Sequence, residues 1–413
     1  MLLRIAPART VTSRIGKASH HLYHGRVSIF PRSSSSRHSA PSAARASHTS
    51  HPRPAAPSLL NRATHAASRA GGVLVDKKID KKNGRSIGKK IAATAGAAGA
   101  AGAAAALLGA SRFRLAVTTI PMLDKGTFRG RRNEFRILHI SDLHMLPHQQ
   151  LKQLWVSELA ELQPDLVVNT GDNLGDPKAV PAVVQTLSPL LTTPGLFCFG
   201  TNDYWAPTAP NPLRYLTGKK QKHSDQSMPW KNLRAVFKEH GWEDCTHQRH
   251  DFAVDGFRLA VAGVDDPHGD LDDYSLIAGE PNKDADLSIG LTHSPEPRVL
   301  DAFAKDGYQL ILAGHTHGGQ LCLPGGKPIV TNSGIDREHA SGVSEWKDSI
   351  LNVSPGLGTS KFAPVRTFCP PTAQLLRIVE KGGGGTDDLP EPTIDEIEVG
   401  DGFIEREIVL KGL

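Results

Sequence analysis

The second half of the chain alternates short apolar runs with longer amphipathic segments. The apolar, β-prone runs predict strands near 135–141, 165–170 and 195–200. Segments with a helical repeat of apolar residues predict helices near 148–162 and 178–192. This alternation of strand and helix is typical of an α/β fold.

After about residue 242 the pattern changes to one dominated by strands. The apolar, β-prone residues gather in four runs, at 252–262, 285–291, 309–313 and 319–330. Together with the preceding α/β part, they predict two packed mixed β-sheets flanked by helices.

Five short polar motifs follow these apolar runs and contain the residues that could carry chemistry. In order, they are Asp142-Leu143-His144, Gly171-Asp172-Asn173, Gly200-Thr201-Asn202-Asp203, Thr292-His293 and Gly314-His315-Thr316-His317. Taken singly, His144 or His293 would more often be a core or loop histidine than a ligand. Taken together, carboxylates and imidazoles in this number suit two divalent ions of Mn, Fe, Zn or Mg, and the absence of Cys argues against a structural zinc site.

The order and spacing of the motifs resemble those of the calcineurin-like metallophosphoesterases over residues 112–378, and most of all their membrane-associated bacterial branch. The resemblance implies an αββα sandwich. It further implies that Asp142, His144 and His317 bind a first metal, that His293 and His315 bind a second, and that Asp172 bridges the two. Two metals held in this way would activate a hydroxide that attacks phosphorus.

The activity implied is hydrolysis of a phosphomonoester, a phosphodiester or a pyrophosphate. A lipid or envelope-glycan phosphate would fit an enzyme tethered to a membrane, although this step rests on analogy. The alternatives are a cyclic-nucleotide or nucleic-acid phosphodiesterase and a degenerate, non-catalytic metal-binding scaffold.

The third motif departs from the family pattern. Thr201 stands where the family has an Asn ligand, and Asn202 stands where it has its catalytic His. We expect Asn202 to reach the second metal by a slip of one residue, and we assign catalytic roles to Asp172, Asn202 and Asp203. Either Tyr204 or His268 could replace the missing imidazole, but the sequence does not place either one near the metals.

Two further segments are candidates for binding substrate. The polar stretch between residues 203 and 230 contains Tyr204, Arg214 and Lys219–Lys222, and could form a recognition loop or a solvated insertion. The glycine-rich segment 355–360 precedes Arg366, which could pair with a phosphate. We therefore predict Tyr204 and Arg366 as substrate-binding residues, with a role for Arg366 in capping the fold as the alternative.

The N-terminal segment has a different composition from the rest of the chain. Residues 1–90 hold 18 Lys/Arg and 2 Asp/Glu, a net charge of +16, so residues 91–413 sum to −10 in a chain of net charge +6. The basic segment is of low complexity and is predicted to be disordered; it could be a targeting segment, a basic arm or spurious upstream translation. The negative sum of the remaining chain makes nucleic acid an improbable partner.

Residues 91–110 form a run of 20 Ala- and Gly-rich positions without a charge. We expect a signal anchor or transmembrane segment here, which would associate the protein with the cell membrane and place the catalytic domain outside the cytoplasm. A soluble Ala-rich helix is the alternative, and a cytoplasmic or organellar location stays open. Residues 379–413 read as a Gly-rich linker and an acidic C-terminal tail.

Overall fold

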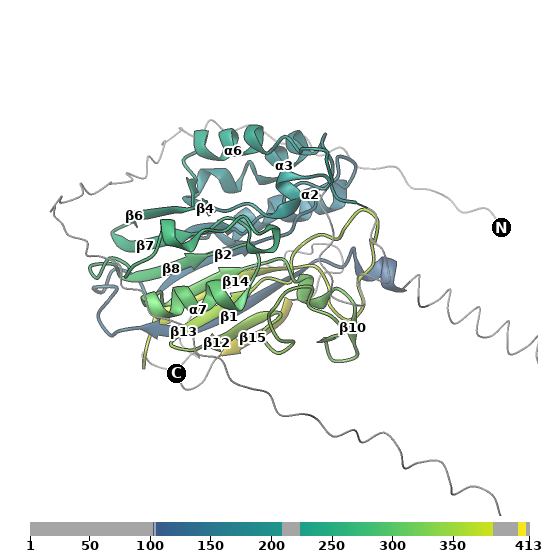
Figure 1. Ribbon diagram of the computed structural model, residues 1–413. Coiled ribbons are helices and arrows are strands. Elements are labelled where there is room, and N and C mark those ends of the chain that lie inside the picture. The colour runs from purple at the N-terminus through teal and green to yellow at the C-terminus, as the bar shows by residue number, and fades with distance from the viewer. Residues whose placement is uncertain (1–101, 103–104, 209–223, 383–403, 410–413) are drawn as a thin grey trace, which may run out of the picture. The chain divides into compact units, whose positions relative to one another are not determined.

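The structure is a computed structural model in which residues 102, 105–208, 224–382 and 404–409 are described (Figure 1). The predictions for residues 1–90, for most of 91–110, and for Arg214 and Lys219–Lys222 lie outside these residues. Among the residues described, no helix combines the length and the apolar character needed to cross a membrane. The predicted membrane association rests on residues that lie mostly outside this search, and it stays a prediction.

Two mixed β-sheets form the framework, and their strands are spread over the whole described chain. The seven-stranded sheet has the order β15-β1-β14-β2-β3-β4-β5, made of Ile404–Val409, Arg114–Leu123, Thr372–Glu380, Glu134–Ile140, Leu166–Asn169, Gly195–Phe197 and Glu243–Asp244. The six-stranded sheet has the order β12-β13-β9-β8-β7-β6, made of Gly342–Trp346, Ser349–Val353, Leu310–Ala313, Leu287–Leu291, Phe257–Gly263 and Gln248–Val254. A short ribbon pairs β10, Cys322–Leu323, with β11, Lys327–Pro328.

Helices cover the outer faces of both sheets (Figure 1). The helices α2 (Gln150–Glu158), α3 (Val180–Leu187) and α6 (Trp230–Glu239) share an apolar core with the seven-stranded sheet, and α7 (Pro297–Asp306) shares one with the six-stranded sheet. Shorter helical segments among the described residues include α4 at Thr201–Tyr204 and 3-10 turns at Leu159–Leu162, Leu190–Thr192, Pro267–Gly269, Tyr274–Leu276 and His317–Gly319. The predicted α/β fold of two mixed sheets flanked by helices is confirmed.

A third apolar cluster fills the space between the two sheets. Phe135 and Ile137 of β2 and Ile378 of β14 contribute from one sheet, and Leu259 of β7 and Ile289 of β8 contribute from the other. All five side chains are buried, and burial of a side chain of this size stabilises a fold by roughly 1.5–3 kcal/mol. This dry core fixes the two sheets against each other.

Parallel strands lead into all five motifs at the edges of the sheets. In the seven-stranded sheet, β2, β3 and β4 run parallel and lead into Asp142, Asp172 and Gly200. In the six-stranded sheet, the parallel strands β8 and β9 lead into His293 and His315. Since parallel strands end at the same edge of a sheet, residues far apart in sequence meet there.

Three predicted strands differ from the observed ones. The run 252–262 is a hairpin of β6 and β7, because Asp255 and Gly256 have φ of 50° and 82° and form a tight turn. The run 319–330 contains only β10 and β11, since Gly325 and Gly326, with φ of 91° and 78°, turn the chain between them. The strand expected at 195–200 ends at Phe197, where the chain turns toward the third motif.

Candidate metal centre

The motif residues occupy an unusual backbone conformation. Asp142, His144, Asp172, His315 and His317 have φ of 51°, 39°, 56°, 69° and 51°. Left-handed backbone in residues other than glycine is uncommon and costs of order 1–3 kcal/mol where the surroundings enforce it. Five such residues in three motifs indicate that these loops adopt an unfavourable backbone conformation in order to place the motif side chains.

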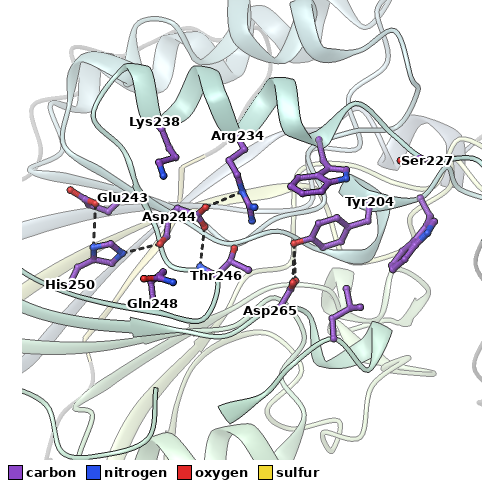
Figure 2. A pocket seen from close by; sticks show the side chains of 13 residues that line it. Tyr204, Ser227, Arg234, Lys238, Glu243, Asp244, Thr246, Gln248, His250 and Asp265 are labelled. Carbon is purple, nitrogen blue, oxygen red and sulfur yellow. Dashed lines mark hydrogen bonds and ion pairs between the residues drawn. The ribbon is translucent and has the colours of Figure 1, made fainter. Parts of the chain in front are cut away.

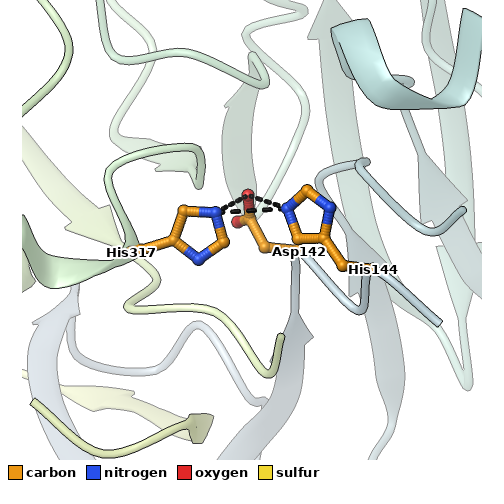
Figure 3. Close-up of side chains that lie close together, drawn as sticks. All are labelled: Asp142, His144 and His317. Carbon is orange, nitrogen blue, oxygen red and sulfur yellow. Dashed lines mark hydrogen bonds and ion pairs between the residues drawn. The ribbon is translucent and has the colours of Figure 1, made fainter. Parts of the chain in front are cut away.

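Asp142, His144 and His317 form the first cluster of potential ligands (Figure 3). The Oδ1 atom of Asp142 lies 3.6 Å from Nε2 of His317 and 3.9 Å from Nε2 of His144. The other carboxylate oxygen, Oδ2, accepts hydrogen bonds from the Ser141 hydroxyl at 2.6 Å and the His315 amide at 3.0 Å. These bonds fix the carboxylate so that Oδ1 is directed at the two imidazoles.

Asp142, Asp172 and His293 form the second cluster, in which one potential ligand atom of each residue lies within 4.8 Å of the others. Nδ1 of His293 lies 2.6 Å from the Thr170 carbonyl oxygen. A carbonyl can only accept, so Nδ1 carries a proton and the ring presents Nε2 to the cluster. Histidines that ligate metals commonly hold a carbonyl in this way.

Asp172 lies between the two clusters. Its Oδ2 atom is 3.5 Å from Nε2 of His144 and also 3.5 Å from Nε2 of His293. A carboxylate at this position could contact cations on both sides. The number of metals and the bridging role remain predictions.

Three buried polar atoms at this site have no hydrogen-bond partner: Nδ1 of His144, Oδ1 of Asp142 and Nε2 of His293. The side chains of Asp142 and His293 are fully buried, and the 3.5 Å from Nε2 of His293 to Asp172 is too long for a good hydrogen bond. Leaving such atoms unpaired is costly. Carboxylate oxygens and imidazole nitrogens are ligands for Mn, Fe and Zn, so the residues present fit a bound divalent cation.

The charges of the cluster also favour a cation. Burial alone raises the pKa of Asp172, but His293, His144 and the Asn202 amide hold it well below its ordinary value. Burial alone lowers the pKa of His293, but the carboxylates of Asp172, Asp266 and Asp142 raise it well above its ordinary value. The buried carboxylates thus stabilise a positive charge beside them, and a divalent ion would supply such a charge.

His315 lies at the edge of this cluster. Its ring centroid is 5.2 Å from that of His293, and its Nε2 lies 3.1 Å from the Asn332 carbonyl oxygen. Neither cluster of potential ligands includes a nitrogen of His315. Its backbone amide holds Asp142, while its predicted role as a ligand stays a prediction.

Asn202 contacts the site by hydrogen bonds to the Asp172 carboxylate. Its backbone amide donates to Oδ1 of Asp172 at 2.8 Å, and its side-chain amide donates to Oδ2 at 2.6 Å. The preceding Gly200 is needed for this approach, because a Cβ atom there would lie 2.3 Å from Oδ1 of Asp172. The structure thus shows Asn202 orienting a predicted ligand, and its own contact with a metal is untested.

Asp203 lies beneath the site and is fully buried. Its carboxylate accepts from the backbone amides of Asn173, Leu174 and Gly200 and from the Asn173 side chain. Burial raises the pKa of Asp203 to about 7, and Asp172 adds to the effect. These contacts hold the second and third motifs together, which is a positioning role; the predicted catalytic role has no support from them.

Arg366 does not present an open face to a substrate. The side chain is 1% exposed, and its guanidinium donates to the carbonyl oxygens of Pro355, Gly356, Gly358, His317 and Cys369. It also lies 3.1 Å from Nδ1 of His317. In this structure Arg366 fastens the glycine-rich loop and contacts His317, which agrees with the alternative role of capping the fold, while its predicted phosphate contact stays a prediction.

Tyr204 lines a cavity of about 690 Å³ whose lining includes none of the clustered potential ligands (Figure 2). Its hydroxyl donates to Asp265 at 2.9 Å, and burial with this carboxylate raises its pKa. In the same cavity, Arg234 pairs with Asp244 at 2.9 Å, and its guanidinium carbon lies 4.7 Å from the Trp230 ring centroid. Tyr204 thus lies at a hollow that could take part of a substrate, and its predicted role stays a prediction.

Sequence reasoning missed the residues that orient the ligands. Ser141 and Thr170 precede the first and second motifs and hold Asp142 and His293, while Asp266 anchors Thr201 of the third motif. Ser141 and Thr170 were accessible as the polar residues directly before a motif. The partner of Asp266 was not, since Thr201 lies 65 positions away and on the other sheet.

The comparisons with known proteins agree with this fold and site. Residues 135–319 match the model of the family described as calcineurin-like phosphoesterase. The match covers less than half of the chain, and it supports the resemblance of this region to the calcineurin-like metallophosphoesterases, a metal-dependent family of phosphoesterase hydrolases.

Three curated bacterial proteins are similar over most of their length. Two are from Bacillus subtilis: uncharacterized protein YpbG, 27% identical over 59% of this chain and 80% of its own length, and uncharacterized metallophosphoesterase YkuE, 26% identical over 59% and 79%. The third, phosphodiesterase YaeI of Escherichia coli, is 24% identical over 61% of this chain and 85% of its own. The sequence-based recognition of the superfamily is confirmed.

Proposed function

We propose that this protein is a metal-dependent phosphohydrolase with a binuclear centre, and that phosphodiesters are its preferred substrate class. The observation that carries the proposal is the pair of buried, unpartnered atoms, Oδ1 of Asp142 and Nε2 of His293, inside a cluster of carboxylates and imidazoles. The similarity to a relative named as a phosphodiesterase supports the choice of ester.

The residues divide between holding ions and orienting those that hold them. Asp142, His144 and His317 would hold one ion, and Asp172 and His293 would take part in holding a second. When bound, divalent ions here would neutralise the charge of a phosphate and lower the pKa of water. The protein's own contribution is rigidity, because Asn202 fixes both oxygens of Asp172.

The substrate class within phosphate esters follows from charge and analogy. Residues 91–413 carry a net charge of −10, which weakens the case for a nucleic-acid substrate, since that binding depends on neutralising many phosphates. A small phosphorylated molecule or a lipid or glycan phosphate remains our proposal. An extracytoplasmic catalytic domain at the cell membrane is part of the same proposal.

The test compares two chromogenic esters with the full chain. The protein is stripped of metal, reloaded with Mn, Zn, Fe or Mg, and assayed with bis-p-nitrophenyl phosphate and p-nitrophenyl phosphate. We expect metal-dependent hydrolysis with a preference for the diester. A His293→Ala variant should lose activity, whereas the matched variant His240→Ala, at an exposed helix end, should keep it.

Two results would contradict the proposal. Hydrolysis that persists without metal, or in the His293→Ala protein, would exclude this centre as the site of reaction. Metal bound in two equivalents without turnover of either ester would favour the non-catalytic scaffold.

A further inference from the structure

The third motif, Gly200-Thr201-Asn202-Asp203, supplies no imidazole to the candidate metal centre. Asn202 occupies the corresponding position, and both of its N–H groups are directed at Asp172. Thr201, its neighbour, is turned away from Asp172 and donates to Oδ2 of Asp266 through its backbone amide at 2.8 Å and through its hydroxyl. This contact leads to another segment of the chain.

That segment is the 3-10 turn Pro267–Gly269, which brings His268 to the centre. The ring centroid of His268 lies 4.2 Å from that of His315, and the His315 centroid lies 5.2 Å from that of His293. The three imidazoles form a row that starts at the fully buried His293. His268 is at the other end of the row and is partly exposed, so a molecule in solution could reach it.

The turn is held firmly against the third motif. Asp266 is fully buried; its Oδ1 accepts from the His268 amide at 2.9 Å, while its Oδ2 holds Thr201. A Cβ atom on Gly269 would lie 3.2 Å from the Thr201 hydroxyl, so the turn and the motif are in close contact. One carboxylate therefore fixes His268 relative to the residues that orient Asp172.

We propose that His268 is a substrate-contacting residue that donates an imidazole N–H to a phosphate oxygen of the ester. The third motif cannot make this contact, because it contains no imidazole. The inference rests on the proposed function, because it presumes a phosphate at the metal centre. It does not depend on the protonation state of the ring, since a neutral imidazole has one N–H donor and an imidazolium has two. Neither cluster of potential metal ligands contains an atom of His268, so it can act on the substrate without holding a metal.

The test measures phosphate binding apart from turnover. The full chain, reloaded with Mn, is titrated with inorganic phosphate by calorimetry, and its metal content is measured by elemental analysis. The variants are His268→Ala, His268→Gln, whose amide can still donate, and the matched control His240→Ala. Their thermal unfolding is compared with that of the unchanged protein, and kcat and KM are measured with bis-p-nitrophenyl phosphate.

A hydrogen bond to a charged group typically accounts for a factor of roughly 10 to 100 in affinity. We expect phosphate affinity and kcat/KM to fall by about this factor in His268→Ala and by less in His268→Gln, with metal content and thermal unfolding unchanged. The control should match the unchanged protein in every measurement.

Three results would overturn the inference. They are phosphate binding unaffected by His268→Ala, loss of a metal equivalent in that variant, and absence of phosphate binding by the metal-loaded unchanged protein. Phosphate binding that depends on His268 without turnover of either ester would support the contact while overturning the proposed hydrolysis, so the two proposals fail separately.

Discussion

The Nε2 atoms of His144 and His317 lie 3.1 Å apart. Arg366, which can only donate, lies 3.1 Å from Nδ1 of His317. Nδ1 of His317 must therefore accept, so in the neutral ring the proton resides on Nε2, which donates to Nε2 of His144. The two facing Nε2 atoms thus share one hydrogen bond at the point where a cation would bind.

Metal binding at the second cluster should release a proton. The carboxylates of Asp172, Asp266 and Asp142 raise the pKa of His293 well above its ordinary value, so its ring is an imidazolium, and a metal ligated by Nε2 has to displace that proton. We expect calorimetric titration of the metal-free protein with Zn to show release of about one proton for the ion bound there at pH 7, judged from buffers of different ionisation enthalpy. The same apparent heat in every buffer would contradict this protonation of His293.

Replacement of Asp172 should affect both clusters at once. The Asp172→Asn change removes a charge from a carboxylate 3.5 Å from both His144 and His293, and it leaves an amide facing the N–H groups of Asn202. We expect activity to fall at least about 100-fold and metal content to fall by at least one equivalent, as measured by elemental analysis. Full metal content in this variant would exclude the bridging role.

Asp176 provides the matched control for this change. It follows the same motif but is partly exposed, and its contacts are with the Lys178 amide and the Lys361 side chain. The Asp176→Asn protein should keep its metals and its activity. Equal losses in both variants would show that charge in this loop, and not the position of Asp172, governs metal binding.

Replacement of Arg366 distinguishes a structural role of this side chain from a role in binding substrate. Its replacement by Met leaves several buried carbonyl oxygens without donors, each costing about 1–3 kcal/mol. We expect Arg366→Met to lower the free energy of unfolding by more than about 3 kcal/mol and to weaken metal binding through His317. Chemical denaturation measures the first effect. An unchanged stability with a raised KM would instead restore the phosphate contact predicted from sequence.

The sequence predicted the sheet framework well because buried parallel strands are read from local apolar runs. The runs before Asp142, Asp172 and His293 are β2 and β3 of one sheet and β8 of the other, and the polar residues after them lie in one cluster of potential ligands. Turn geometry was less accessible: the hairpin at Asp255 depends on left-handed backbone at two residues, which the apolar run 252–262 concealed.

The potential ligands of the candidate site could be predicted from the sequence, but the residues that orient these ligands could not. Asp142 and His317 belong to compact motifs, so their chemistry is visible in a few adjacent letters. The sequence predicts Arg366 as a phosphate-binding residue because a Gly-rich loop with an arginine suits that task as well as it suits a structural role; the burial of its side chain in the structure favours the structural role. His268 stood in no motif, and its place beside His315 is a consequence of the buried contact between Asp266 and Thr201.

A buried histidine away from the centre should make the fold sensitive to acid. His139 is fully buried; the Asn352 amide donates to its Nδ1 at 2.7 Å, and its Nε2 lies 3.0 Å from the Thr170 hydroxyl. Burial lowers its pKa to about 3, against about 6.5 for an unfolded chain. Between these values the unfolded chain binds more protons, so the stability contributed by neutral His139 is complete above pH 6.5 and is lost as the pH falls toward 3.

We expect the stability lost between pH 7 and pH 5, measured by urea denaturation, to be about 2 kcal/mol smaller in His139→Gln than in the unchanged protein. The exposed-site variant His240→Ala should lose as much as the unchanged protein, and equal losses in all three proteins would show that His139 does not govern the acid response.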